Sequence, residues 1–293
     1  MTDADKERSP GARLRASWSQ GAVAIPGAFN ALTAKMIERL GFSAAYFSGG
    51  ALSAGWAGVP DIGLLTMSEF AEQIAVIARA TRLPLLCDAD TGFGEAINAA
   101  RTVELYEAAG AAGLHLEDQI LPKRCGHLSG KALIEPEAMA AKVRAAAKSR
   151  RDPDFVVVAR TDARSVEGIE RAIDRAKRYL DAGADAIFPE ALESRDEFER
   201  FAREVSAPLI ANMTEFGKSQ LLSVRELDAL GYRGVLFPLT PFRAAMQAAE
   251  AMLVELRDAG TQANALDRLQ TRSRLYDLIG YEEWEERDRR FFG

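Results

Sequence analysis

Two kinds of hydrophobic segment alternate along the chain from about residue 21 to about residue 260. Most segments of the first kind are short apolar runs without polar alternation, as expected for parallel strands buried on both faces. They predict strands at residues 21–27, 44–50, 83–90, 113–118, 155–161, 186–190, 208–213 and 234–239. The second kind is amphipathic and predicts helices at 31–40, 67–81, 97–109, 136–149, 169–182, 195–205, 224–230 and 242–259.

A local pattern recurs between helix and strand, in LGFSAAYF, AGAAGLHL, AGADAIFP and LGYRGVLF. In each copy a glycine at the helix end can adopt the left-handed conformation that terminates helices. These glycines are Gly41, Gly110, Gly183 and Gly231. Eight strand–helix units of this kind predict an α/β protein with a (β/α)8 TIM barrel. A doubly wound open sheet is the alternative, but PGAFNAL follows the first strand where that fold has a glycine-rich phosphate turn.

The chain divides into a disordered tail at 1–10, a catalytic barrel at 11–260 and a helical extension at 261–293. The tail, MTDADKERSP, has no apolar segment of the signal-peptide type. The extension is strongly charged, yet it carries the aromatic residues Tyr276, Tyr281, Trp284, Phe291 and Phe292. Burial of these side chains requires packing on the barrel or on a neighbouring subunit, with helices swapped between subunits as one form. We therefore expect a homo-oligomer.

Composition narrows the function classes. Hydrophobic residues make up 48% of the chain and charged residues 27%, which is typical of a globular protein. The net charge is −6 and no basic stripe is present, which argues against a nucleic acid partner. No apolar run is long enough to span a membrane. The two cysteines, Cys87 and Cys125, fit free thiols in a reducing, cytoplasmic compartment.

Polar and ionisable side chains gather at the carboxyl ends of the predicted strands, where barrels hold their active sites. They are Tyr46, Ser48, Asp88, Asp90, His115, Glu117, Arg160, Asp162, Glu190, Asn212 and Thr214. A structural layer of ion pairs would explain any one of them but not the whole set. Asp88 and Asp90 leave the same face of one strand. Converging carboxylates suit a hard ion, Mg²⁺ or Mn²⁺, and a chain with only two histidines is a poor zinc protein.

The segment KRCGH, which begins at Lys123, places the thiol of Cys125 among cationic groups. Nearby positive charge lowers the pKa of a cysteine, so we expect a reactive thiol here. The connection at 119–133 contains Gly126 and Gly130 and is long for a strand–helix loop, which predicts a mobile lid. By composition alone, a basic surface loop with an incidental cysteine remains an equal alternative. Cys87 lies in the apolar run LPLLC and is expected in the core.

KRCGH is the signature of the isocitrate lyase group within the isocitrate lyase and phosphoenolpyruvate mutase superfamily, and the chain resembles that superfamily over almost its whole length. The resemblance also rests on YFSGG, VPDIG, LLCDADTGFG, ARTVELYEAAGAAGLHLEDQ, DPDFVVVARTDA, FPEA, NMTEFG and LFPLTPFRA. Within the superfamily the chain is most similar to the bacterial 2-methylisocitrate lyases. The resemblance implies a magnesium-dependent carbon–carbon lyase acting on a small carboxylic acid. It further implies a homotetramer in the methylcitrate cycle of propionate catabolism.

The resemblance also implies roles for individual residues. Asp88 would hold Mg²⁺, with Asp90 and Glu117 acting partly through water. Cys125 would donate a proton to the developing succinate carbanion, and Tyr46, made more acidic by the metal and nearby cations, is the candidate base. The end of the substrate that becomes pyruvate would be held by Ser48, Gly49, Gly50 and Arg160. The succinate end and the loop would be placed by Lys123, Arg124, Gly126, His127, Arg160, Glu190, Asn212 and Thr214.

The shape of the pocket is expected to decide which of several related acids is the substrate. Phe188 and Leu236, with Asp61 nearby, resemble the 2-methylisocitrate lyases, while 2,3-dimethylmalate lyase and isocitrate lyase activities are alternatives. Oxaloacetate decarboxylases and phosphonate mutases lack the cysteine loop, and a non-catalytic carboxylate-binding barrel would have lost site residues that are all present here. Trp56 stands near Asp61. It either narrows the pocket or packs at the surface or between subunits.

Overall fold

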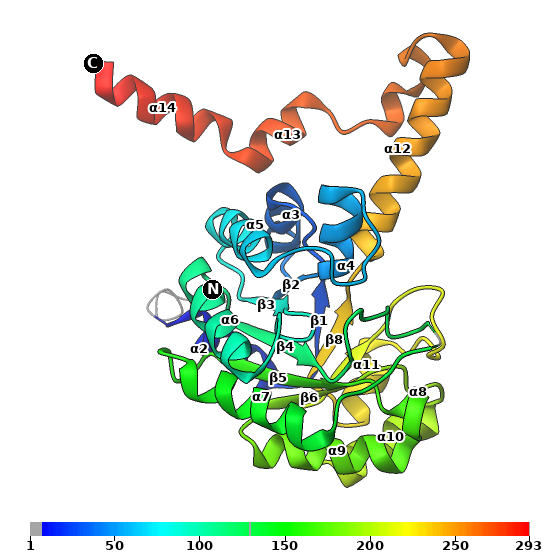
Figure 1. Ribbon diagram of the computed structural model, residues 1–293. Coiled ribbons are helices and arrows are strands. Elements are labelled where there is room, and N and C mark those ends of the chain that lie inside the picture. Colours follow the sequence, from blue (N-terminus) through cyan, green and yellow to red (C-terminus); the bar gives the residue numbers. More distant parts are fainter. Residues whose placement is uncertain (1–7, 129, 293) are drawn as a thin grey trace.

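Eight parallel strands follow one another around a ring in the computed structural model, which describes residues 8–128 and 130–292 (Figure 1). One sheet holds β2 to β6 in sequence order, and a second holds β1, β8 and β7. Single parallel bridges, Gly27 to Tyr46 and Ile187 to Leu209, connect the two sheets. Each strand lies inside its predicted range: β1 (Val23–Pro26), β2 (Ala45–Phe47), β3 (Leu85–Asp88), β4 (Gly113–Glu117), β5 (Val156–Thr161), β6 (Ala186–Pro189), β7 (Ile210–Asn212) and β8 (Gly234–Phe237).

The predicted helices are confirmed to within two residues at each end. Local chemistry sets their limits: Thr66 and Ser223 begin helices with capping boxes, and the four predicted glycines all have positive φ. The helices are α3 (Ala31–Arg39), α5 (Met67–Ala80), α6 (Ala96–Ala109), α7 (Pro136–Ser149), α9 (Ile169–Asp181), α10 (Arg195–Glu204), α11 (Val224–Ala229) and α12 (Thr240–Ala259).

Four further short elements were not predicted. Helix α2 (Pro10–Trp18) begins at the Ser9 cap, inside the segment predicted as a disordered tail; residues 1–7 lie outside the described residues. Leu14 and Trp18 of α2 join the apolar cluster inside the strand ring. The others are α4 (Gly49–Leu52), the π-helix η1 (Ser53–Ala57) and α8 (Arg164–Glu167). These last three have four or five residues and are too short to show the periodicity on which helix prediction depends.

The core has two layers. Inside the ring, side chains such as Ile25, Leu86 and Val158 fill the barrel, and a larger cluster lies between strands and helices. Cys87 belongs to the larger cluster and is fully buried, which confirms its predicted place in the core. No helix within the described ranges is long and apolar enough to cross a membrane.

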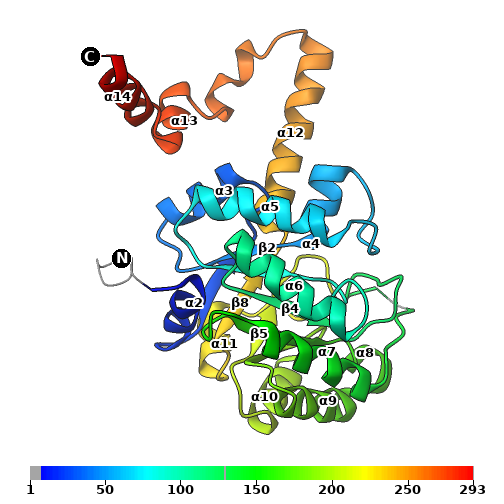
Figure 2. The same ribbon diagram turned by 60° about the vertical axis from the view of Figure 1, so that its left-hand side comes forward.

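The last part of the chain leaves the barrel (Figures 1 and 2). We call residues 240–292 the C-terminal arm; it contains α12, the 3-10 helix η2 (Ala263–Arg268), α13 (Arg272–Ile279) and α14 (Tyr281–Phe292). Helix α12 is where the eighth barrel helix was predicted, but none of its residues is buried. Trp284 is 63% exposed and Phe291 84%. The arm therefore has an apolar surface that its own barrel does not cover.

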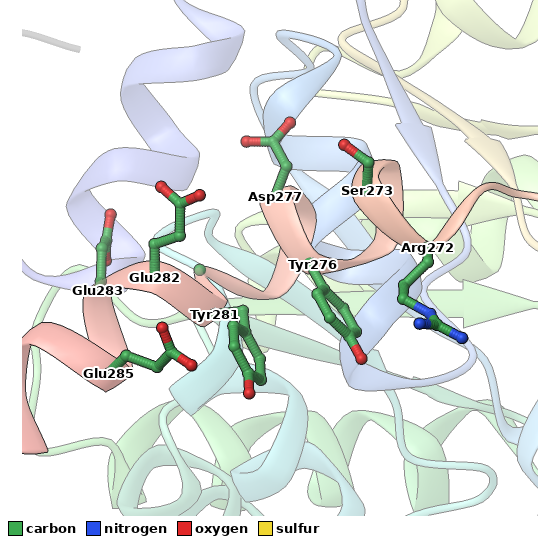
Figure 3. Close-up of a pocket in the computed structure, with 9 residues that line it drawn as sticks. Arg272, Ser273, Tyr276, Asp277, Tyr281, Glu282, Glu283 and Glu285 are labelled. Atoms are coloured by element: carbon green, nitrogen blue, oxygen red, sulfur yellow. The ribbon is translucent and has the colours of Figure 1, made fainter.

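The arm touches the barrel through α13, where Arg39 of α3 pairs with Asp277. Figure 3 shows the hollow that α13 and α14 form together, with Tyr276 and Tyr281 stacked at 4.5 Å between ring centroids. Only residues of the arm line this hollow. It shares no residue with the strand-end chemistry.

Candidate active site

A pocket opens at the carboxyl ends of the strands and collects most of the predicted site residues. Of the predicted set, only Gly49, Asp90 and Glu117 are not in its wall. Asp162 and His115, noted at strand ends, also lie behind it. The wall is formed by Tyr46, Ser48, Gly50, Asp61, Asp88, Lys123, Arg124, Cys125, Gly126, His127, Arg160, Phe188, Glu190, Asn212, Thr214, Leu236, Pro238 and Leu239.

Buried carboxylates form one side of this pocket. Asp88 Oδ2 accepts a hydrogen bond from the backbone N–H of Gly49 at 3.1 Å, and Asp88 Oδ1 accepts one from the N–H of Asp90 at 3.1 Å. A Cβ atom on Gly49 would lie 3.0 Å from Asp88 Oδ2, so glycine permits this approach. Glu117 Oε1 is buried without a hydrogen-bond partner among the described residues. This orphaned oxygen is free to bind a cation or its water.

The carboxylates perturb one another. Burial, together with the charges of Asp88 and Asp61, raises the pKa of Asp90 to about 7 although Lys123 opposes the shift. Burial likewise raises the pKa of Glu117 well above its ordinary value. Asp88 is also buried, but His115, Lys123 and Arg160 outweigh burial and lower its pKa. A site with this surplus of acid favours binding of a cation.

The residues present fit magnesium held partly through water. Within the described part of the chain, no three carboxylate, imidazole or thiol groups are close enough to form a metal cage by themselves. Magnesium retains several waters and binds through one or two carboxylates. Asp88 as the direct ligand, with Asp90 and the unpartnered Glu117 Oε1 reached through water, matches that preference.

Tyr46 and His115 form a buried pair beside Asp88. The Tyr46 hydroxyl lies 2.7 Å from His115 Nε2, and His115 Nε2 lies 3.6 Å from Asp88 Oδ1. Burial and the charge of Asp88 raise the pKa of Tyr46 well above its ordinary value, and burial lowers that of His115 to about 4. In the chain without metal, burial and the carboxylates outweigh Arg160, so the nearby cations alone do not make Tyr46 more acidic. The combined effect of these cations and a bound metal stays a prediction.

Residues 123–127 of the cysteine loop at 119–133 form part of the pocket wall. Its base is pinned by an antiparallel bridge between Gln119 and Leu133. Lys123 Nζ lies 2.5 Å from Asp61 Oδ1 and 2.7 Å from Asp90 Oδ1, and the lysine is almost fully buried. The loop therefore delivers positive charge to the carboxylates beneath it.

Cys125 lies in this loop and is exposed. Desolvation of the thiol and the charge of Glu190 raise the pKa of Cys125, although a hydrogen bond with the His127 backbone opposes the shift. The prediction of a lowered thiol pKa is wrong because desolvation outweighs the nearby positive charge, and two of the cationic neighbours are engaged elsewhere. Lys123 pairs with acids, and His127 Nε2 lies 2.9 Å from Glu190 Oε1. A thiol that keeps its proton is suited to act as an acid.

Arg160 organises the opposite wall. Its Nε lies 3.0 Å from Asp162 Oδ2 and 3.3 Å from Glu117 Oε2, and its Nη1 lies 3.4 Å from Glu190 Oε2. Asn212 Nδ2 donates to Glu190 Oε2 at 3.2 Å. Asn212 Oδ1 is buried without a partner among the described residues, which leaves an acceptor facing this polar wall.

Ser48 and Gly50 lie where β2 passes into α4. The Ser48 Oγ accepts a hydrogen bond from the Ala51 N–H at 3.3 Å as the cap of that helix. Thr214 lines the wall beyond β7. The predicted substrate contacts thus come from several strand ends and from the loop.

An apolar wall is made by Phe188 and Leu236, both fully or almost fully buried. The Arg160 guanidinium lies 5.2 Å from the centroid of the Phe188 ring. Trp56 is 49% exposed in η1 and is not part of the pocket wall. Of the two readings of Trp56, the structure favours the surface position.

Three residues that hold the site were not among those assigned roles from the sequence. Asp162 and Lys131 form a buried ion pair, and Asp118 accepts hydrogen bonds from the Asp162 N–H at 2.9 Å and the Thr161 hydroxyl at 2.8 Å. Asp162 lies at a predicted strand end, but its pairing with Lys131 has no sequence signal because the two residues are 31 positions apart.

Comparison with known proteins agrees with this site. Residues 14–257 match the family described as phosphoenolpyruvate phosphomutase. A 2-methylisocitrate lyase of Aeropyrum pernix is 54% identical over 91% of this chain and 85% of its own length. A 2-methylisocitrate lyase of Salmonella typhimurium is 46% identical over 95% of both chains.

Solved structures give the same result. An oxaloacetate acetylhydrolase with 3,3-difluorooxalacetate has a TM-score of 0.91 at 35% identity, covering 97% of this chain and 98% of its own. A 2,3-dimethylmalate lyase has a TM-score of 0.91 at 32% identity, covering 98% and 96%. A phosphonopyruvate hydrolase complex with oxalate and Mg²⁺ has a TM-score of 0.88 at 32% identity, covering 98% and 100%. The chain therefore belongs to the phosphoenolpyruvate phosphomutase family, within the superfamily that also contains the isocitrate lyases.

Proposed function

We propose that this protein is a magnesium-dependent lyase that cleaves 2-methylisocitrate to pyruvate and succinate. The observation that carries the proposal is the Cys125 thiol, which keeps its proton and lies on a loop closed over buried carboxylates and Arg160. The relatives named 2-methylisocitrate lyase, at 46% and 54% identity, support the same substrate.

Binding would use both the strand ends and the loop. When bound through Asp88, with Asp90 and Glu117 behind water, Mg²⁺ would draw negative charge from the substrate's hydroxyl and adjacent carboxylate. Ser48 and the backbone of Gly49 and Gly50 would hold that same end. The succinate end would bind to Arg160, Asn212, Thr214 and Glu190 from the strands, with Lys123, Arg124, Gly126 and His127 from the loop.

Cleavage begins with loss of the hydroxyl proton. Tyr46 is the candidate acceptor: in its ionised form its oxygen would take the hydroxyl proton, and its contact with His115 Nε2 at 2.7 Å would hold that oxygen in place. The hydroxyl carbon then becomes the carbonyl of pyruvate, and the electron pair of the broken carbon–carbon bond moves to the succinate carbon. Arg160, in the pocket wall, would stabilise the charge that spreads into the neighbouring carboxylate.

The succinate carbanion then takes the Cys125 proton. The thiol is delivered by the loop, so its closure also keeps water from the carbanion. The resulting thiolate regains a proton after the loop opens. A raised pKa for Cys125 favours this direction of transfer, because the thiol holds its proton until a strong base forms beside it.

The apolar wall provides room for the substrate's methyl group. Phe188 and Leu236 are the side chains that would contact it. One methyl group contributes about 1–3 kcal/mol of discrimination in an apolar pocket, so slower turnover of isocitrate is expected. The fold shared with a 2,3-dimethylmalate lyase makes 2,3-dimethylmalate the second acid to test.

A coupled assay for pyruvate tests the proposal. Purified protein with Mg²⁺ is given 2-methylisocitrate, isocitrate and 2,3-dimethylmalate in turn, and kcat/KM is compared. The proposal expects the highest value for 2-methylisocitrate and loss of activity on addition of EDTA. A higher value for either of the other acids, or pyruvate release insensitive to EDTA, contradicts it.

The division of the chain leads to a proposal on assembly. The barrel would be the catalytic unit, and the C-terminal arm would pack on or swap with a neighbouring subunit to form a homotetramer. The exposed aromatic residues of the arm support this assignment. Two free cysteines are in keeping with a cytoplasmic enzyme of propionate catabolism. Removal of residues 261–293 should convert the tetramer to smaller species in analytical ultracentrifugation; an unchanged mass would contradict it.

A further inference from the structure

Lys131 occupies an unusual position at the far end of the cysteine loop. Its side chain is only 1% exposed, although lysine normally keeps its ammonium in water. A buried ammonium is stable only when it is paired and hydrogen-bonded. Lys131 Nζ donates to Asp162 Oδ1 at 2.7 Å and to the backbone carbonyl of Gly126. The two contacts join the loop to a strand end.

The two partners of Lys131 differ in what holds them. Gly126 lies in the loop, directly after Cys125. Asp162 follows β5, is fully buried, and is fixed through its N–H by Asp118 Oδ1 at 2.9 Å. Asp118 in turn accepts a hydrogen bond from the Tyr179 hydroxyl of α9 at 2.8 Å. Lys131 therefore connects the cysteine segment to a part of the barrel that several elements hold in place.

Asp162 also touches the substrate-binding wall. Its carboxylate receives Arg160 Nε at 3.0 Å and Arg160 Nη2 at 3.3 Å. The ammonium of Lys131 thus shares one carboxylate with the guanidinium that is proposed to bind substrate. Gly126 packs against the same group, because a Cβ atom there would lie 2.6 Å from Arg160 Nη2 and 2.3 Å from Glu190 Cγ. The position of Gly126 is therefore sensitive to small displacements.

Other loop contacts involve groups that substrate and metal would engage. Lys123 pairs with Asp90, a candidate metal ligand, and His127 pairs with Glu190 in the pocket wall. Lys131 and Asp162 do not line the pocket. Their contact can therefore persist when the ligands arrive and rearrange the other two.

We propose that Lys131 is a positioning residue that latches the cysteine loop shut, through Asp162 and the Gly126 carbonyl, and so sets the place of the Cys125 thiol over the substrate. The proposal rests on the proposed lyase function for its catalytic consequence, but the latch itself can be measured without any turnover. Lys131 does not touch the reacting atoms. It acts on them through the backbone of the loop.

Alkylation of Cys125 measures the latch directly in the ligand-free full-length protein. Cys87 is buried, so iodoacetamide should report on Cys125. Lys131→Met keeps the length of the side chain but removes its charge and donors. Although Cys125 is exposed as a residue, its thiol is partly desolvated in the latched loop. Loss of a hydrogen-bonded charge from the closed state should therefore raise the alkylation rate about tenfold. Lys131→Arg keeps a cationic donor and should restore a rate nearer to that of the wild type, while Lys148→Met, at an exposed position on α7, controls for net charge.

The catalytic consequence is a separate measurement. Lys131→Met should lower kcat for 2-methylisocitrate about 100-fold, as expected when a reacting group is misplaced by about an ångström, with a much smaller change in KM. A larger effect on KM than on kcat would contradict a role in placing Cys125. If wild-type protein released no pyruvate from any acid, the lyase assignment would fail, whereas the alkylation comparison would still decide the latch.

The latch is overturned if Lys131→Met folds, by circular dichroism and melting temperature, and reacts with iodoacetamide at the wild-type rate. If Lys131→Met does not fold, Lys131→Gln is used in its place, because glutamine retains a donor for the Gly126 carbonyl. If neither variant folds, hydrogen exchange on the wild-type protein decides. Slow exchange of the loop peptide that carries Gly126 supports a latched loop, and exchange as fast as in an open chain contradicts it.

Discussion

The strand ends and the cysteine loop contribute opposite halves of the active site. The strand ends supply Asp88, Asp90, Glu117 and Glu190, held by short strands in a closed ring. The described part of the loop supplies mostly cations and a thiol, and its base is held by the Gln119–Leu133 bridge and neighbouring backbone hydrogen bonds. The strand-end residues are held in place by the barrel core, whereas the cysteine loop is held mainly by its charge pairs with the strand-end residues.

This difference shows how the two halves depend on each other. Without the loop, the strand ends hold more buried acid than a stable site favours, as the raised pKa values of Asp90 and Glu117 indicate. Without the strand ends, the cations around Cys125 would be free to stabilise its thiolate. In the folded chain, desolvation of the thiol and the charge of Glu190 raise the pKa of Cys125 and keep it protonated. In the proposed mechanism, closure would therefore prepare the acid as well as exclude water.

Removing the loop's reactive group should have the largest effect. Cys125→Ser leaves the charge pairs of the loop intact but replaces the thiol with a poorer acid, so kcat should fall by about 10⁴-fold. Steady-state pyruvate release measures the loss. Cys87→Ala, at a buried position outside the pocket wall, serves as the matched cysteine control and should keep most of the activity. Substantial turnover by Cys125→Ser would refute Cys125 as the acid.

Removing a strand-end carboxylate should have the next largest effect. Asp88→Ala takes away the proposed direct magnesium ligand, and kcat/KM should fall about 10³-fold because metal stabilisation of charge contributes several kcal/mol. Titration calorimetry with Mg²⁺ on the same variant checks the cause. Magnesium affinity equal to that of the wild type would show that the metal is held elsewhere.

The pH dependence of the thiol gives a smaller but sharper test. Because the pKa of Cys125 is raised, the thiol stays protonated at neutral pH and ionises only above its ordinary range. Its iodoacetamide reactivity should therefore rise at a pH above about 8.5, the value for an unperturbed cysteine. Reactivity that rises below pH 8 would mean that the loop cations act on the thiol after all.

The smallest expected effect is on stability. The pKa of Asp90 is about 7 in the folded chain and about 4 in an unfolded one, so its protonated form favours folding. Its contribution is fully present below pH 4 and is lost as the pH rises through 7. In metal-free protein, the melting temperature should fall by a few degrees over this range relative to Asp90→Asn. Parallel curves for the two proteins would contradict the raised pKa.

Most features of the strand ends could be predicted from the sequence, but fewer features of the cysteine loop could. The strands could be predicted because buried parallel strands are continuous apolar runs, and their ends then locate residues such as Asp88 and Glu117. The direction of the pKa shift of Cys125 could not be predicted from the sequence. The positive charge of the neighbouring Lys123 is neutralised by Asp61, which is 62 positions away. The role of Lys131 was missed for the same reason. Pairings across the fold, rather than neighbours in sequence, decide charge.

The most direct test of the two-part site is the stereochemistry of protonation in D₂O. Succinate formed from 2-methylisocitrate should carry one deuterium at the new methylene carbon, as a single enantiomer, because Cys125 delivers it from one side of a closed site. Mass spectrometry counts the deuterium atoms, and chiral analysis of the succinate determines the configuration at the deuterated carbon. Racemic monodeuterated succinate would contradict the account, since it would mean that the carbanion is protonated by solvent after the loop has opened.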